Sequence, residues 1–135
     1  MFVDTSAFYA LEDGADVHHR EARALQRNLM VGRPQLFTTH DVLDECVTLI
    51  GSRLGPPRAV QFARGLLSSR AVAVIYSDEV LEEAALHVYD RFQDGRLSFT
   101  DCLSFAVMRA LEISTAFAFD RHFKRAGFAT LRLDS

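Results

Sequence analysis

The fold of this chain is decided by the stretch Met1-Phe2-Val3-Asp4-Thr5-Ser6. Its apolar residues run directly into a carboxylate, and two hydroxyl residues then lead into a helical pattern, one of them expected to cap that helix. Because ligands of open α/β sheets bind at the carboxyl ends of the strands, we expect Asp4 at a binding edge. A second apolar run, residues 115–119, ends in the same way at Asp120. The sequence therefore predicts two neighbouring strand ends that each carry an acid.

The bulk composition is typical of a single globular domain over residues 1–135, with 49% hydrophobic and 24% charged residues. No stretch approaches the roughly 20 apolar residues of a membrane helix, and no signal-peptide pattern is present. Cys46 and Cys102 lie in helical patterns without a CxxC spacing, which is typical of small buried side chains in a reducing cytosol. We therefore expect a cytoplasmic domain with no membrane association.

The basic residues are almost all arginines, since Lys124 is the only lysine among 15. A bias in genomic base composition would explain this without any function. Arginine also binds phosphate through a bidentate fork, so a phosphate-contacting surface is the functional alternative. The net charge of −3 is compatible with nucleic-acid binding if the acids cluster in one metal site and the arginines line its rim.

The apolar periodicity alternates between strand and helix patterns along the chain. Strands are predicted at the first apolar run and over residues 35–39, 71–76, 115–119 and 128–133. Helices are predicted over residues 6–12, 16–31, 41–54, 57–69 and 98–112, after the Ser77-Asp78 cap up to residue 92, and up to residue 125. This alternation predicts an α/β fold, a three-layer α/β/α sandwich with a mainly parallel sheet of about five strands.

Three local features follow from the same patterns. Val17 is expected on the buried face of the helix over residues 16–31. Thr38 and Asp41 have the spacing of a capping box at the start of the next helix. The strand over residues 71–76 is apolar throughout, as expected for a parallel strand that is covered on both faces.

Two further acids, Glu45 and Asp101, lie among apolar neighbours on predicted helices. Such acids are costly to bury unless they are paired or bind a metal. Structural alternatives exist for each of them. Ser98 can form a capping box with Asp101, Glu45 beside Asp44 can favour a helix dipole, and the two strand-end acids can cap the helices that follow them.

Convergence of the four acids would favour a divalent cation. Two carboxylates about 4 Å apart repel by roughly 4 kcal/mol at an effective dielectric constant of about 20. Ligands that are all oxygen favour Mg²⁺ or Mn²⁺ over Zn²⁺. Such an ion lowers the pKa of a bound water and orients a phosphodiester. Hydroxyl groups at Thr5, Ser6 and Thr100 are expected to support water or phosphate.

The order and spacing of these motifs resemble the PIN-domain family. The resemblance covers essentially the whole chain, and the segments that carry it are residues 2–6, 39–45, 97–106 and 118–123. The small single-domain size is similar to the VapC-type toxins of toxin–antitoxin pairs. The implied fold is the same PIN-like α/β sandwich.

The resemblance implies a Mg²⁺- or Mn²⁺-dependent endoribonuclease, the toxin component of a type II toxin–antitoxin system. By position, Asp4, Glu45, Asp101 and Asp120 would form the acidic quartet that binds metal and performs catalysis. A homodimer is also implied, together with a cognate antitoxin whose tail covers the active site. The helix pair near residues 41–69 would form part of the partner groove, although its apolar residues are more often core: Leu49, Ile50, Leu54, Phe62 and Leu66.

One position departs from the family pattern, because many members carry a further acid where this chain has His122. The departure predicts weaker metal occupancy or one firmly held ion. His122 itself is interpreted either as a contact to RNA phosphate or as an exposed helix residue. The other histidines show no metal-binding spacing and are read as surface or capping residues: His18, His19, His40 and His87.

Two other functions are weighed against the nuclease. A phosphoryl-transfer or receiver domain needs a lysine near the phosphate, and here only Lys124 is available. Such domains also carry a pair of acids at the end of the first strand, which the segment Asp4-Thr5-Ser6 lacks. A non-catalytic PIN-like module that binds RNA or protein would be expected to lose an acid, whereas all four are present. Cleavage that depends on a divalent ion would exclude the second alternative.

Overall fold

The computed structural model describes residues 1–133, which fold around a five-stranded sheet in which every pairing is parallel. The strand order is β3-β2-β1-β4-β5. The strands are β1 (Phe2–Val3), β2 (Leu36–Thr39), β3 (Val72–Ile75), β4 (Thr115–Phe117) and β5 (Ala129–Thr130). In β1 and β4, Val3 lies opposite Phe117, so the prediction that these strand ends are neighbours is confirmed.

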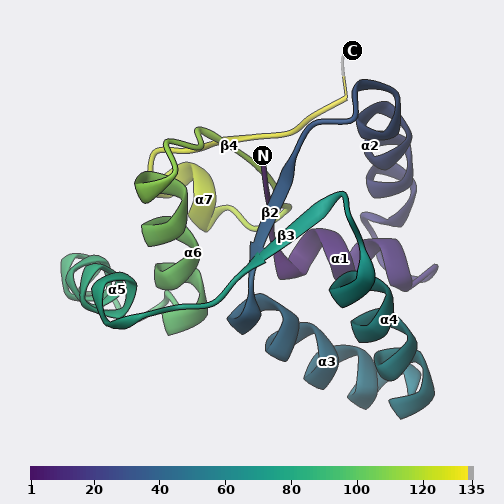
Figure 1. Ribbon diagram of the computed structural model, residues 1–135, viewed down its shortest axis with the longest axis horizontal. Helices are drawn as coiled ribbons and strands as arrows, with labels where there is room; N and C mark the ends of the chain where they lie inside the picture. The colour runs from purple at the N-terminus through teal and green to yellow at the C-terminus, as the bar shows by residue number, and fades with distance from the viewer. Residues whose placement is uncertain (134–135) are drawn as a thin grey trace.

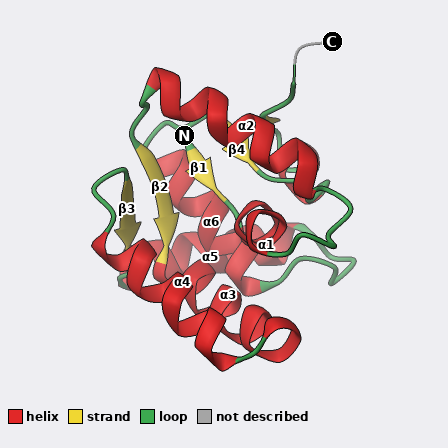
Figure 2. Cartoon of the chain, turned by 90° about the vertical axis from the view of Figure 1, so that its right-hand side faces the viewer, coloured by secondary structure: helices red, strands yellow, loops and turns green. Residues whose placement is uncertain are grey.

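Helices cover both faces of the sheet. They are α1 (Thr5–Glu12), α2 (His19–Gly32), α3 (His40–Leu54), α4 (Pro56–Ser68), α5 (Glu79–Arg91), α6 (Phe99–Ala110) and α7 (His122–Arg125). Figure 1 shows α1, α2 and α4 on one side of the strands and α5, α6 and α7 on the other, with α3 below. Figure 2 shows β3, β2, β1 and β4 side by side. The predicted three-layer α/β/α sandwich is confirmed.

An aromatic cluster packs the C-terminal helices against the centre of the sheet. Phe123 of α7 contacts Phe105 of α6 edge-to-face, with ring centroids 5.0 Å apart, and lies 6.2 Å from Phe2 of β1. All three side chains are fully buried. Because α7 directly follows the end of β4, this packing fixes the loop that carries Asp120 relative to the first strand.

The start of α3 differs from the predicted capping box. Thr39 is the N-cap, and its Oγ1 accepts a hydrogen bond from the Val42 N–H at 3.0 Å. Thr38 is still in the sheet, opposite Val74, and its hydroxyl donates to the Val3 carbonyl at 2.8 Å. The Thr38 box was therefore wrong by one residue, because the strand continues to its last threonine before the helix begins.

Two other local expectations were also wrong. Helix α2 begins at His19, because Asp16 organises a turn in which its carboxylate accepts from the His18 N–H, and Val17 in that turn is 88% exposed. Strand β3 lies at the edge of the sheet and is half-buried throughout. The apolar run therefore does not mark a fully covered strand, because β3 pairs along one edge only and its residues remain partly accessible.

The remaining bulk expectations concern the cysteines and membrane helices. Cys46 and Cys102 are both buried and carry free thiols, as predicted. Within residues 1–133, no helix is both long and apolar enough to cross a membrane.

Replacing Thr38 by valine is expected to lower the free energy of unfolding by about 1–3 kcal/mol, because the buried Val3 carbonyl loses its donor. Urea titration followed by circular dichroism measures this change. The same substitution at Thr48, an exposed residue of α3, is expected to change stability by less than about 0.5 kcal/mol. Equal effects of the two substitutions would contradict this role of Thr38.

Candidate active site

Asp4 is buried at the junction of β1 and α1, with 3% of its surface exposed. It is the N-cap of α1, and its Oδ2 accepts hydrogen bonds from the Ser6 N–H at 3.2 Å and the Ser6 hydroxyl at 2.7 Å. The expectation that Thr5 or Ser6 caps this helix was wrong. Asp4 takes that role because its side chain precedes the first helical residue and reaches the free N–H groups of the first turn.

Ser6 connects the two strand ends that carry acids. Its Oγ donates to Asp4 and accepts a hydrogen bond from the Phe119 N–H at 3.0 Å. The Asp4 N–H in turn donates to the Phe117 carbonyl at 3.0 Å. These bonds hold the segment that leads from β4 to Asp120 against the start of α1. These contacts position Asp4, whereas the predicted contact of the Ser6 hydroxyl with water or phosphate stays a prediction.

Asp101 lies in the first turn of α6 and forms a reciprocal capping box with Ser98. The Ser98 Oγ accepts from the Asp101 N–H at 3.0 Å, and the Asp101 carboxylate accepts from the Ser98 N–H at 3.4 Å. The structural reading of Asp101 is thus correct. It does not remove Asp101 from the site, because its pKa also responds to the charges of Asp120 and Glu45.

Asp120 follows β4 and turns the chain into α7. Its Oδ1 accepts from the His122 N–H at 2.9 Å and lies 3.9 Å from His122 Nε2. The His122 side chain is only 15% exposed, and its buried Nδ1 has no hydrogen-bond partner among residues 1–133. The reading of His122 as an exposed helix residue was therefore wrong. The imidazole packs beside the acid that it follows.

Glu45 is exposed in the second turn of α3, where it lines an open cavity of about 460 Å³ together with Thr100 at the start of α6. Asp41, rather than Glu45, is the acid in the first turn of α3. A helix-dipole role for Glu45 is therefore wrong. Its position places a carboxylate at the solvent-accessible side of the site, near enough to raise the pKa of Asp101.

The Thr5 side chain does not hydrogen-bond to Asp4 as the Ser6 side chain does. Its Oγ1 is buried and has no hydrogen-bond partner among the described residues. Burial raises the pKa of the Cys46 thiol, and the Thr5 hydroxyl acts in the opposite sense on the same thiol. Thr5 therefore faces Cys46 on α3, and its predicted support of water or phosphate stays a prediction.

The pKa values of Asp4 and Asp101 respond to the charges of the other predicted acids. Burial, followed by the charges of Asp101 and Asp120, raises the pKa of Asp4 to about 7, against the lowering effect of the Ser6 hydrogen bonds. Burial is also the largest cause of the raised pKa of Asp101, followed by the charge of Asp120 and, against the Ser98 hydrogen bonds, that of Glu45. The pKa values of Asp4 and Asp101 are therefore raised by neighbouring carboxylates as well as by burial, as expected for like charges in a shared site.

The donor set fits a divalent cation of the Mg²⁺ or Mn²⁺ type. Within residues 1–133, none of the four carboxylates forms an ion pair with an arginine or lysine, so their repulsion is uncompensated. In the described part of the chain, no group of three or more His, Cys, Asp or Glu side chains is arranged so that it could hold a metal ion by itself. An open arrangement suits Mg²⁺, which keeps several waters and takes only one or two direct carboxylates.

A family model of the PIN domain matches residues 1–129. The chain belongs to the PIN-domain family. The resemblance stated from the sequence motifs is thereby confirmed, and the match extends from the first strand through β4 and α7 into β5.

Known relatives of this PIN domain include VapC proteins. The chain is 38% identical over 132 residues to the 23S rRNA-specific endonuclease VapC20 of Mycobacterium tuberculosis H37Rv, covering 98% of each. It is 32% identical over 113 residues to a VapC ribonuclease of Archaeoglobus fulgidus, covering 82% of this chain and 71% of that protein. The crystal structure of Mycobacterium tuberculosis VapC20, described as a sarcin–ricin loop cleaving toxin, superposes with a TM-score of 0.87 at 37% identity over 98% of each chain.

The structure also brings basic residues to the site of this PIN domain that the sequence did not single out. Arg121, Lys124 and Arg132 line a cavity that Asp120 shares. The sequence analysis expected His18 inside a helix that begins at residue 16. In the structure His18 lies in the turn before α2, where it lines this cavity. The available signal was the aromatic–acid–basic run Phe119-Asp120-Arg121.

Replacing Asp4 by asparagine is expected to change how stability depends on pH. The raised pKa means that the native carboxyl stays protonated while the unfolded one ionises, so wild-type stability is full below about pH 4 and falls until about pH 7. Asparagine removes this loss, so its stability relative to wild type rises by up to about 4 kcal/mol between these pH values. Urea unfolding in EDTA at several pH values measures the difference.

The matched control is Asp90→Asn, which changes an exposed acid of α5. Its stability relative to wild type is expected to stay nearly constant over the same pH range. Parallel pH profiles for wild type and Asp4→Asn would show that the Asp4 carboxyl is not buried as described.

Proposed function

We propose that this PIN domain is a metal-dependent endoribonuclease that hydrolyses RNA phosphodiester bonds as the toxin of a type II toxin–antitoxin pair. The observation that carries the proposal is the electrostatic proximity of Asp4, Asp101, Asp120 and Glu45, none of which pairs with an arginine or lysine within residues 1–133. Relatives whose names specify endonuclease or ribonuclease activity support it.

Asp4, Asp101 and Asp120 would hold Mg²⁺ or Mn²⁺, with Glu45 at the open side. When bound, such an ion supplies Lewis-acid chemistry that acidifies water and neutralises phosphate charge. The hydrogen bonds from Ser6 hold the Asp4 carboxylate in place, and the capping box does the same for Asp101. Both carboxylates are thus preorganised by groups that also fix their helices.

Glu45 and Thr100 would act on the water and the RNA. The cavity that they line is open, so a water or a phosphate oxygen has access to both side chains. Glu45 has the exposure that a group needs to accept a proton from an attacking water. Attack of that water on phosphorus forms one P–O bond, and the bond to the leaving ribose oxygen breaks as that oxygen takes up a proton.

Structured ribosomal RNA is the substrate class to test first. The basis is similarity alone, since the relative that matches nearly the whole chain is named as a 23S rRNA-specific endonuclease. The arginine-rich composition also supports an RNA substrate, because arginine side chains bind phosphate groups.

Replacing Asp101 by asparagine is expected to lower cleavage of a mixed cellular RNA pool by at least about 100-fold, because one charged ligand is removed. Asparagine keeps an oxygen that can accept the Ser98 N–H, so the capping box and the fold persist. RNA is incubated with purified protein in Mn²⁺, Mg²⁺ or EDTA and analysed by gel. EDTA is expected to abolish cleavage by the wild type.

Asp90→Asn serves as the control and is expected to cleave as the wild type does. A second readout is thermal unfolding with and without Mn²⁺, in which the wild type is expected to gain stability and Asp101→Asn to gain less. An Asp101→Asn protein that retains full, metal-dependent cleavage would refute the assignment. Cleavage by the wild type in EDTA would refute the metal requirement.

The partner proposal comprises a cognate antitoxin and a homodimer. Of the apolar residues of α3 and α4 considered for the groove, Ile50 and Leu66 are buried and Leu49, Leu54 and Phe62 pack partly on the core, as the core reading predicted. Phe62 and Leu66 also line a cavity of about 640 Å³ beside α1, which supports a groove for an apolar segment.

Size-exclusion chromatography with light scattering is expected to give twice the 15.2 kDa mass of the chain. Co-expression with a candidate antitoxin is expected to yield a complex that does not cleave RNA until the partner is removed. A monomeric protein would contradict the dimer, and full cleavage by the intact complex would contradict the antitoxin.

A further inference from the structure

A separate cavity of about 230 Å³ opens on the β4–β5 side of Asp120. One wall comes from the segment that follows β4, with Phe119, Asp120 and Arg121. Lys124 of α7 and the segment after β5 form the opposite rim, and the turn before α2 closes it. Because the ends of β4 and β5 meet the start of α2 here and Asp120 lines the cavity, the cavity adjoins the acidic site at the carboxyl edge of the sheet.

The rim of this cavity carries unneutralised positive charge. Arg121, Lys124 and Arg132 are all exposed, and none of them forms an ion pair with a carboxylate within residues 1–133. Arg125 of the same helix, by contrast, pairs with Asp94. Cations gathered around a concave surface without acidic partners favour an anionic ligand.

A flat aromatic surface lies where the turn before α2 meets the segment that follows β4. The imidazole of His18 stacks on the ring of Phe119, with centroids 4.4 Å apart and an interplanar angle of 6°. Both residues are only half-buried and both line the cavity. Nucleobases stack on such surfaces in proteins that bind single-stranded nucleic acids.

Two carboxylates also line the cavity, namely Glu21 and Asp120. They leave the lining positive, because three basic side chains outnumber them. The cavity volume lies below the roughly 300–1,000 Å³ of pockets for larger ligands, so a single nucleotide is the appropriate size.

We propose that this cavity binds the nucleotide of the RNA substrate next to the scissile phosphodiester. Arg121, Lys124 and Arg132 contact its phosphate, and its base packs against the stack of His18 on Phe119. The proposal rests on the proposed ribonuclease function, and it adds the direction that the RNA takes from the acids, toward β5.

The test is RNA binding in a form that does not cleave. In an Asp101→Asn background, a fluorescent single-stranded RNA is titrated with protein and followed by anisotropy at several salt concentrations. Replacing Arg121, Lys124 and Arg132 together by alanine is expected to weaken binding about tenfold. The slope of log K against log salt is expected to fall by about 0.7, which corresponds to one lost phosphate contact.

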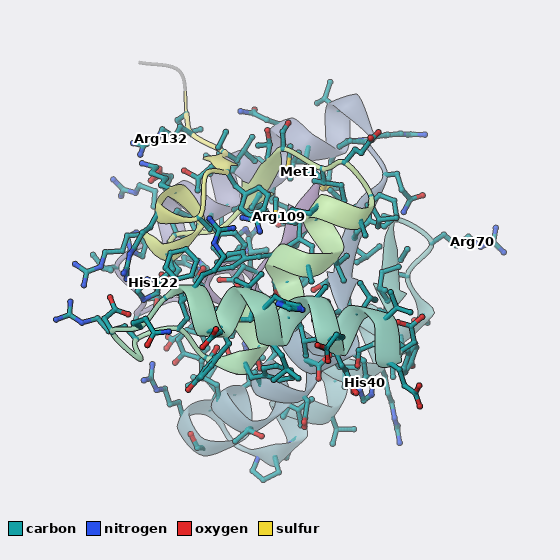
Figure 3. All side chains as sticks on the ribbon, turned by 90° about the vertical axis from the view of Figure 1, so that its left-hand side faces the viewer. Met1, His40, Arg70, Arg109, His122 and Arg132 are labelled. Atoms are coloured by element: carbon teal, nitrogen blue, oxygen red, sulfur yellow. The ribbon has the colours of Figure 1, made fainter. Side chains whose placement is uncertain are left out.

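A matched control removes the same charge elsewhere. Arg27, Arg64 and Arg70 are exposed residues of α2, α4 and the segment before β3, and their joint replacement by alanine keeps the net charge equal to that of the cavity variant. Figure 3 shows Arg70 on the opposite side of the molecule from Arg132 and His122. This control is expected to bind RNA within about twofold of its parent.

The stacking surface is tested with His18. His18→Ala is expected to weaken RNA binding about tenfold, while His18→Phe, which retains a flat ring, is expected to bind nearly as its parent does. Thermal unfolding of both variants separates this effect from a loss of stability. Equal RNA affinity of His18→Ala and His18→Phe would overturn the base contact.

Cleavage kinetics separate this inference from the function on which it rests. In the wild-type background, the triple cavity variant is expected to raise KM about tenfold with kcat within about twofold. If the wild type cleaves RNA but the cavity and control variants behave alike, the cavity proposal fails and the ribonuclease stands. If the wild type does not cleave but only the cavity variant loses RNA affinity, the function fails and the RNA site stands. A cavity variant that binds RNA normally but no longer binds an acidic partner protein would also overturn the proposal.

Discussion

The hydroxyl of Ser6 is the contact on which the candidate site depends. It donates to Asp4 at the end of β1 and accepts from the Phe119 N–H beyond the end of β4, so one side chain joins segments 113 residues apart. Without this bridge, the two central strands would still pair, but the acid after each strand would not be held in a common orientation. The raised pKa of Asp4 reflects the same closeness, since burial and the charges of Asp101 and Asp120 act on it together.

The acids of this PIN domain combine two roles that the sequence analysis treated as alternatives. Asp4 caps α1 and Asp101 completes the capping box of α6, and both carboxylates remain within electrostatic reach of the other acids. A carboxylate that receives N–H groups from a helix start is held in one orientation, which is what a preorganised ligand requires. Helix capping at Asp4 and Asp101 is therefore compatible with metal binding and supports it, because it orients both carboxylates.

Hydrophobic periodicity was enough to predict the sheet, the layers and the strand ends, because apolar spacing follows directly from which faces are buried. The errors occurred where side-chain hydrogen bonds decide between adjacent residues. Thr38 and Thr39 are chemically the same, and only the length of β2 determines which one caps α3. The turn at Asp16 likewise shortened α2 and placed His18 beside Phe119, a contact that no local pattern encodes. Asp4 and Asp120 were identified from their positions at strand ends, and Glu45 and Asp101 from their apolar neighbours, whereas the cavity beside Asp120 required the fold.

The strand order has a consequence for the synthesis of the protein. The central strand β1 pairs with β4, which follows it by more than a hundred residues. The part of the chain up to the end of α3 contains only two of the four acids, Asp4 after β1 and Glu45 in α3. At translation rates of about 5–20 residues per second, β4 follows β1 by on the order of ten seconds. The nascent chain lacks Asp101 for most of that interval and Asp120 for all of it, so the candidate site cannot assemble on a half-made protein. In a domain built in this order, the candidate site is complete only when nearly the whole of residues 1–133 has been synthesised.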